Sequence, residues 1–164
     1  MKLLDFKEYL DKDNFTTKYY EHTKELPFDR LNLILPLKKQ SNLVLEMLYT
    51  PGLAGILKDF KLLQYFVRLP LEFDAQTLEP IKSLIFKLNM GIPLMGFGVN
   101  EDDLYIYFKS VTMVPNTNQA SEDTLRVLIE NVYMIGFIFD TFYELIENIA
   151  TGKKTLEETL KDLT

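Results

Sequence analysis

The chain has 164 residues, of which 47% are hydrophobic and 26% charged, and it contains no cysteine. This length and composition predict one globular domain that buries about 70% of its unfolded surface. The lack of cysteine excludes disulfides and thiolate metal sites and favours a reducing compartment. The net charge of −6 comes from residues 101 to 164, which carry 5 Lys or Arg against 12 Asp or Glu. An acidic chain without a basic run lacks the surface that binds phosphates, so we expect no nucleic-acid partner.

The N-terminal part predicts a short helix over residues 2 to 10, in which leucine and phenylalanine residues share one side. Acidic residues interrupt this segment, so we expect no export signal and a cytoplasmic protein. Residues 15 to 26 fit either a strand or a helix, because Thr and Tyr favour a strand while Tyr19, His22 and Leu26 also share a helical face.

A period of two begins at residue 31 and indicates strands. Leucines occupy alternate positions over residues 31 to 37, and after a short turn the apolar alternation resumes over residues 43 to 49, which predicts a hairpin. A third strand is expected over residues 61 to 71. Pro36 has no N–H to donate, so the first strand should lie at an edge of the sheet or bulge there.

Helical spacing returns over residues 78 to 88, with Asp74 or Thr77 as the cap and Asn89-Met90-Gly91 as the stop. The next segment, residues 92 to 114, reads as two apolar strands, 92 to 99 and 104 to 114, joined by an acidic turn over residues 100 to 103. The element order to this point is helix, three strands, helix and two strands.

The last large element is a helix expected over residues 122 to 150, capped by Ser121. One apolar stripe should lie on the sheet, and further apolar residues leave the helix middle apolar nearly all round, so it must be covered on more than one side. Cover could come from the N-terminal helix, from a helix over residues 155 to 163, or from a second subunit. The residues of this possible dimer or helix-packing face are Val127, Met134, Phe137, Ile138 and Leu145.

The whole chain, residues 1–164, is therefore predicted to be one α+β domain of order α-β-β-β-α-β-β-α with about five strands. Residues 1–29 hold the N-terminal helix and the unassigned segment, and residues 152–164 form a helical tail. A membrane span is not expected, because Asp140 and Glu144 interrupt the long helix well short of the roughly 20 apolar residues that a span needs.

The element order, the segment LNMGIPLMGFGVNEDDLYIYFKSV and the long aromatic helix after it resemble the YbjN-like family and the wider superfamily of type III secretion chaperones. The resemblance covers about residues 31 to 150. It implies a twisted antiparallel sheet packed by helices, frequent dimerisation and binding of other proteins. YbjN-like members are often described as bacterial sensory-transduction or stress regulators, and the resemblance brings no set of functional residues with it.

The sequence contains no strong pattern of residues that indicates a catalytic site. His22 is the single histidine and has no marked serine beside it, so a surface role is the better interpretation. Gly96-Phe97-Gly98 lies inside a predicted strand, lacks a third glycine and precedes an acidic turn, so close backbone packing or a bend explains it better than dinucleotide binding. We expect no enzymatic activity and no cofactor.

Two groups of acidic residues are candidates for a metal site. The turn Glu101-Asp102-Asp103 could offer oxygen ligands to a hard cation but lacks the spaced ligand series of a loop site. Asp140, Glu144 and Glu147 share one side of the long helix, but no Glu-x-x-His motif faces them. Both groups are predicted to be solvated, and no metal is expected.

One face of the sheet gives the most informative candidate site. If the leucine rows of the first three strands face the helices, the opposite face presents an apolar set interspersed with polar side chains, which suits partner recognition. Its members are Ile34, Val44, Leu48, Leu62 and Phe66. The alternative is that residues 15 to 26 fold over this face.

We therefore predict a non-enzymatic, dimeric protein-binding or chaperone-like module, with a role in stress or signalling as the resemblance implies. It would bury an extended or helical client segment on this face or pair with it along a free strand edge. The alternative is a small-molecule sensor with a pocket between the sheet and the long helix, lined by Tyr105, Tyr107, Phe139 and Tyr143.

Overall fold

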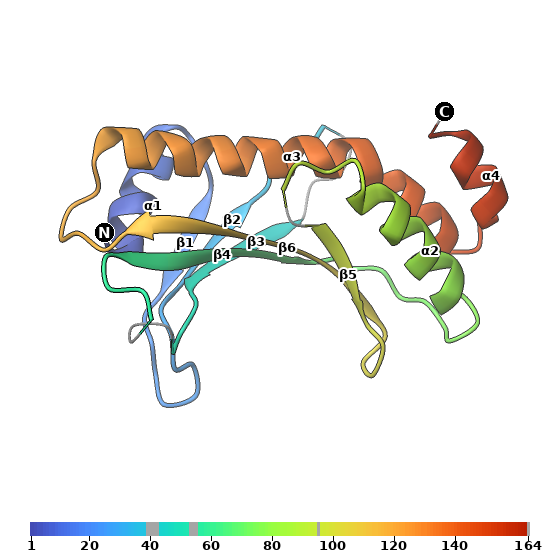
Figure 1. Ribbon diagram of the computed structural model, residues 1–164, viewed down its shortest axis with the longest axis horizontal. Coiled ribbons are helices and arrows are strands. Elements are labelled where there is room, and N and C mark those ends of the chain that lie inside the picture. Colours follow the sequence, from blue (N-terminus) through green and yellow to red (C-terminus); the bar gives the residue numbers. More distant parts are fainter. Residues whose placement is uncertain (39–42, 53–55, 95, 164) are drawn as a thin grey trace.

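The computed structural model describes residues 1–38, 43–52, 56–94 and 96–163, which form an antiparallel sheet and its covering helices (Figure 1). The elements in chain order are α1 (Leu3–Lys12), β1 (Thr17–Tyr20), β2 (Arg30–Ile34), β3 (Val44–Tyr49), β4 (Phe60–Arg68), α2 (Leu78–Asn89), β5 (Gly96–Asn100), β6 (Tyr105–Pro115), α3 (Glu122–Ala150) and α4 (Leu156–Lys161). The predicted α+β class is confirmed. Six strands are found in the described residues, in the spatial order β1-β2-β3-β4-β6-β5, where about five were expected.

The additional strand is β1, from the segment that the sequence left unassigned. Asn14 adopts a positive φ of 64° after α1 and redirects the chain, and β1 then pairs antiparallel with β2. The expectation that Pro36 places the first leucine strand at an edge or in a bulge is wrong. β2 ends at Ile34, before the proline, and β1 pairs along its other side, so β2 is an interior strand.

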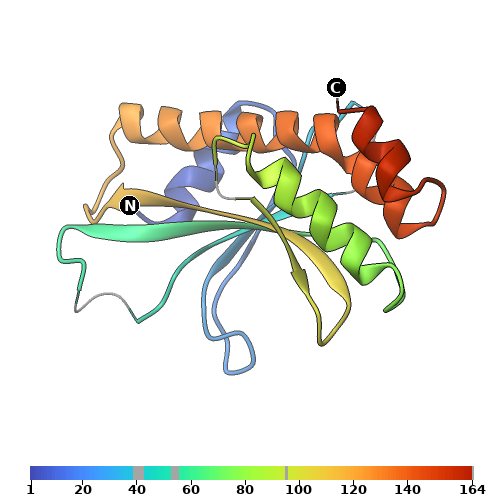
Figure 2. The same ribbon diagram turned by 45° about the vertical axis from the view of Figure 1, so that its right-hand side comes forward.

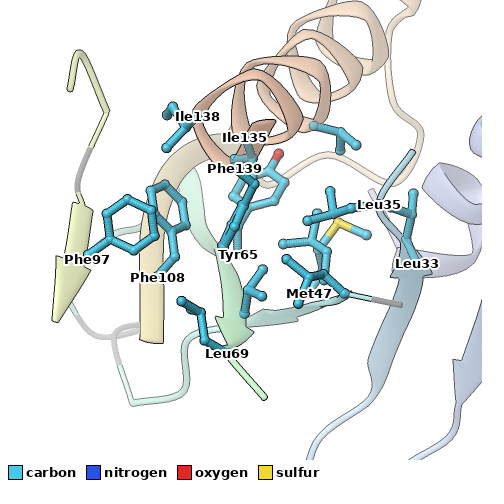
Figure 3. Packing of buried hydrophobic residues seen from close by; sticks show 14 of the residues in the cluster. Leu33, Leu35, Met47, Tyr65, Leu69, Phe97, Phe108, Ile135, Ile138 and Phe139 are labelled. Atoms are coloured by element: carbon cyan, nitrogen blue, oxygen red, sulfur yellow. The ribbon is translucent and has the colours of Figure 1, made fainter. Parts of the chain in front are cut away.

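The helices of the described residues all lie on one side of the sheet, as the two views in Figures 1 and 2 agree. Alternation along each strand directs every second side chain to this side, where the fully buried residues include Leu33, Met47 and Tyr65. Phe97 of β5 and Phe108 of β6 meet Phe139 of α3 there, with ring centroids 5.3 to 5.6 Å apart (Figure 3). The core therefore lies between the sheet and α3.

The long helix α3 begins and ends where the sequence predicts. Ser121 accepts a hydrogen bond from the Thr124 N–H at 3.2 Å and caps it. The helix α1 contacts α3, and α2 and α4 also pack against it, so helices of the same chain flank it. Among the described residues, no helix combines the length and the apolar character that crossing a bilayer takes.

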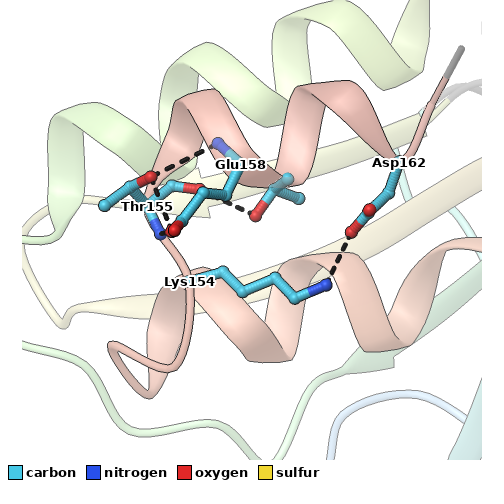
Figure 4. Close-up of polar contacts among 5 residues, drawn as sticks. Lys154, Thr155, Glu158 and Asp162 are labelled. Carbon is cyan, nitrogen blue, oxygen red and sulfur yellow. Dashed lines mark hydrogen bonds and ion pairs between the residues drawn. The ribbon is translucent and has the colours of Figure 1, made fainter.

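The helical tail ends in a well-capped turn of helix, α4. Thr155 and Glu158 form a capping box, with the Thr155 N–H donating to Glu158 Oε2 at 2.8 Å and the Glu158 N–H donating to Thr155 Oγ1 at 3.3 Å (Figure 4). Lys154 and Asp162 pair across α4 at 2.8 Å. These local bonds satisfy the first backbone donors of a helix too short to be stable alone.

Candidate functional site

The candidate site is the side of the sheet that faces away from the helices, called the open face below. It consists of the alternate residues of each strand that do not point to α3. The strand register aligns one complete row of residues across the sheet. In order from β1 to β5, the row is Lys18, Asn32, Glu46, Phe66, Lys109 and Gly96. No helix of the described residues covers this side in either view (Figures 1 and 2).

The open face exposes apolar side chains in its middle and at one end. Ile34 and Val44, which are register partners, are each 44% exposed, and Met113 is 55% exposed. The remaining predicted members, Leu48, Leu62 and Phe66, also lie on this face and are half-buried. The five side chains that the sequence grouped therefore do share one face, and the alternative that residues 15 to 26 fold over them is not what the structure shows, because β1 pairs at the edge of the sheet instead.

An aromatic cluster occupies the open face where β4, β6 and β5 meet. The rings of Phe66 and Tyr107 stack with centroids 5.6 Å apart, and Tyr105 lies 6.1 Å from Tyr107. The Tyr107 ring fits closely over Gly98, where a Cβ atom would lie only 2.4 Å from a ring carbon. Close backbone packing thus accounts for this glycine, as predicted. The cluster borders a shallow depression of about 430 Å³.

Two cations alternate with these rings. Phe66 is opposite Lys109 and Arg68 is opposite Tyr107, so the rings lie on one diagonal and the cations on the other. Arg68 Cζ lies 4.4 Å from the centroid of the Tyr105 ring, a cation–π distance. Arg68 is exposed and Lys109 half-buried, and neither forms an ion pair within the described residues.

The open face carries more positive than negative charge although the whole chain is acidic. Its charged residues in the described chain are Lys18, Arg30, Glu46, Arg68 and Lys109. Arg30 forms an ion pair with Glu46, with Nη1 2.8 Å from Oε2. The Lys18 ammonium lies 4.8 Å from the centroid of the Tyr20 ring. Acidic residues gather instead at the two ends, in the β1–β2 connection and in the β5–β6 turn, where Lys82 of α2 binds Glu101 at 3.1 Å. Of the cations of this face, Lys18 and Arg68 therefore lie against rings, whereas Arg30 pairs with a carboxylate.

The alternative small-molecule pocket is not formed by the residues that predicted it. Tyr105 and Tyr107 lie on the open face, whereas Phe139 packs in the core and Tyr143 lies beside it on α3. The reason is the strand alternation, which turns Ile106 and Phe108 of β6 toward α3 and the two tyrosines away from it. In the described part of the chain no cavity is lined by all four residues.

The predicted dimer or helix-packing face divides between surface and core. Phe137 is 65% exposed and Val127 is 55% exposed, and Met134 is also exposed, all on the outer side of α3. Ile138 is buried in the core, and Leu145 is half-buried against it. The outer side of α3 therefore offers three of the five side chains to a partner.

The polar candidates lie at separate places in the fold, in the β1–β2 connection, in the β5–β6 turn and on α3. His22 is exposed in the β1–β2 connection, where its Nδ1 lies 2.8 Å from Asp29 Oδ1, and the hydrogen bond to this carboxylate raises the pKa of His22. Within the described ranges, no three His, Asp or Glu side chains come together to hold a metal ion. Asp140 instead accepts the Lys38 N–H at 2.9 Å, and Glu147 pairs with Lys153 at 3.6 Å.

The sequence reasoning missed Asn89, which closes the free edge of β5. Its side chain donates to the Phe97 carbonyl at 2.8 Å and accepts from the Phe97 N–H at 2.9 Å. A Cβ atom at Gly96 would lie 2.1 Å from the Asn89 amide oxygen, so only glycine leaves room for this arrangement. An asparagine at a helix end followed by a Gly-x-Gly strand is the one signal that the sequence contained.

A scan against protein-family models finds no match for this chain, and a search of curated proteins finds no similar sequence.

Proposed function

We propose that the protein is a non-enzymatic binding module that holds a segment of another protein against the open face. The observation that carries the proposal is a sheet with helices on one side only, whose other side exposes Ile34, Val44 and Met113 next to polar side chains. Ile34 and Val44 are register partners and so form one contiguous apolar area, and monomeric proteins seldom expose large apolar areas without a partner for them.

The energetics favour a broad contact. Complete burial of a large apolar side chain contributes about 1.5–3 kcal/mol, so a side chain already half-covered contributes about 1 kcal/mol. Association costs at least about 4 kcal/mol before any net affinity appears. Ile34, Val44 and Met113 alone are too few, and a partner must also contact the cluster around Phe66 and Tyr107.

The face is a better binding site than the strand edges. At β5, Asn89 already occupies both backbone hydrogen-bonding groups of Phe97, which blocks the addition of a strand there. At the opposite edge, β1 is only four residues long. A partner is therefore expected to bind through side chains on the face and not through main-chain pairing.

The resemblance to YbjN-like proteins and type III secretion chaperones fits this proposal. The resemblance rests on the element order α-β-β-β-α-β-β-α, which the observed order contains with β1 added after α1 and α4 added at the end. We propose on this basis a chaperone-like or regulatory protein whose client is another polypeptide.

The proposal is tested by recovering partners with matched variants. Val44→Asp with Phe66→Asp changes the open face. Phe86→Asp with Met90→Asp changes exposed positions of the helix layer away from the outer side of α3. We expect partners that copurify with the wild-type protein to be lost with the first pair and kept with the second. Partners retained by a folded Val44→Asp/Phe66→Asp variant, as judged by circular dichroism, would refute the proposal.

Self-association through α3 is a second proposal, which the exposure of Phe137 and Val127 favours. Light scattering coupled to size-exclusion chromatography across a concentration series tests it. A dimer that dissociates in Phe137→Glu supports this role for α3, and a monomer at every concentration excludes it.

A further inference from the structure

The charge pattern of the open face indicates what kind of segment binds there. The row from Lys18 to Lys109 crosses five adjacent strands, and strands lie about 4.8 Å apart, so its end residues are separated by about 19 Å at the backbone. A helix of about 13 residues spans that distance. Between the two lysines lie Asn32, the Glu46 that Arg30 neutralises, and Phe66.

The cations on this face are available to a ligand. Arg68 and Lys109 flank the Phe66–Tyr107 stack on adjacent strands, and Lys18 lies at the far end of the row. Side chains that are diagonal neighbours across two strands lie about 7–8 Å apart. A segment with an apolar residue on the two rings therefore places its neighbouring side chains within reach of Arg68 and Lys109.

The same pattern disfavours a basic segment and a nucleic acid. A basic segment would place its charges against Lys18, Arg68 and Lys109, and the one acid of the described open face, Glu46, is already paired. A nucleic acid gains affinity from a run of phosphate contacts. Here the cations form no continuous run, because three residues of the row separate Lys18 from Lys109, and the acidic β5–β6 turn borders the aromatic cluster.

We infer that the open face binds an acidic, amphipathic segment of another protein, with its apolar side on Phe66, Tyr107 and Val44 and its carboxylates at Arg68, Lys109 and Lys18. This inference rests on the proposed function and adds the chemistry of the partner. Glu101 and Asp102 border the depression at the β5–β6 turn, so we expect the carboxylates of the segment at the three cations and not at that turn.

The test uses the full chain and defined probes in a fluorescence anisotropy titration. One probe is a dye-labelled 18-residue helix-forming peptide with leucines on one side and flanking glutamates, and its twin carries lysines in place of the glutamates. A labelled 20-nucleotide single-stranded oligothymidine is the third probe. We expect the acidic peptide to bind at least about tenfold more tightly than its twin, because each exposed ion pair contributes up to about a factor of five.

Matched charge reversals assign the effect to the face. Arg68→Glu with Lys109→Glu should weaken binding of the acidic peptide about tenfold or more and strengthen binding of the lysine twin. Arg68→Gln with Lys109→Gln removes the charges without reversing them, so it should weaken binding of the acidic peptide less. Lys87→Glu with Arg126→Glu makes the same change in net charge on the exposed helix layer and should leave both peptides unaffected. Circular dichroism and urea midpoints confirm that each variant is folded.

The possible outcomes distinguish failure of the predicted acidic preference from failure of the proposed binding function. Equal binding of both peptides, abolished by Phe66→Asp, overturns the acidic preference and leaves the open face as a binding site. Preference for the lysine twin, or an oligothymidine complex that depends on Arg68 and Lys109, overturns the inference in favour of another ligand. Failure of both peptides to bind also overturns it, and partner recovery with Val44→Asp/Phe66→Asp then decides the proposed function alone.

Discussion

The two faces of this sheet are built by the same strands and have opposite surroundings. Toward α3, residues such as Leu45, Tyr65 and Phe108 are completely buried, and Ser110 and Thr159 are the buried polar residues found in the described chain. On the open face, apolar residues of similar size alternate with Glu46, Gln64 and Lys109. The comparison teaches that interleaved charge, and not the number of apolar residues, distinguishes the face that helices cover from the face that they leave open.

The largest expected difference between the two faces is in how much the loss of an aromatic ring lowers the stability of the protein. Phe108→Ala removes a completely buried ring that contacts Phe97 and Phe139, and it should lower the free energy of unfolding by about 3–5 kcal/mol. Phe66→Ala removes a half-buried ring of equal size, and about 1 kcal/mol is expected. Urea unfolding measures both, and equal losses would mean that Phe66 is a core residue.

The next effect concerns the edge of β5, which separates the two faces at one end. Asn89→Ala leaves the N–H and C=O of Phe97 without their side-chain partner, and we expect a loss of about 1–3 kcal/mol. Hydrogen exchange of the Phe97 amide should also accelerate. Lys87→Ala, an exposed change on the same helix, is the control, and unchanged exchange in Asn89→Ala would show that the edge is closed by something else.

A smaller effect is expected at the end of the helix layer. Thr155→Ala removes the cap of α4 and should cost about 1 kcal/mol, seen as faster hydrogen exchange within α4. Peptide binding at the open face should not change, because α4 lies on the other side of the sheet. Weaker binding in this variant would contradict the separation of the two faces.

The smallest effect is the pH dependence of the β1–β2 connection. Because the hydrogen bond to Asp29 raises the pKa of His22 in the folded protein, its stabilisation is complete below the unfolded pKa of about 6.5. It is lost as the pH rises through the higher folded pKa. NMR titration should show His22 titrating at lower pH in Asp29→Asn, and identical titrations in both proteins would rule out the contact.

Local patterns predicted most elements and the strand pairs joined by short turns, whereas the pairing of β4 with β6 could not be predicted from them. The helical period and Ser121 predicted α3 with its observed bounds. Apolar alternation correctly placed Ile34, Val44 and Phe66 on one side of the sheet, because the alternation within a strand does not depend on which strands lie beside it. The segment that contains β1 fitted either a strand or a helix, because a run of four residues is too short to show which period the sequence follows.

The aromatic and basic part of the open face was missed for a different reason. Tyr107 and Lys109 join Phe66 only through the pairing of β4 with β6, which brings together strands separated by α2 and β5 in the chain. The grouping of Tyr105 and Tyr107 with Phe139 failed because aromatic character does not specify a side of the sheet. Asn89 acts through backbone groups of β5, which no side-chain pattern reveals.

The most direct test of the open face as a binding site is photo-crosslinking in cells at single positions. A benzophenone amino acid replaces Val44 on the open face or Phe86 on α2, both exposed. The account predicts a discrete crosslinked complex with another protein from position 44, absent from position 86 and lost when Phe66→Asp is added. Crosslinks from position 86 alone, or crosslinks from position 44 that Phe66→Asp leaves unchanged, would contradict it.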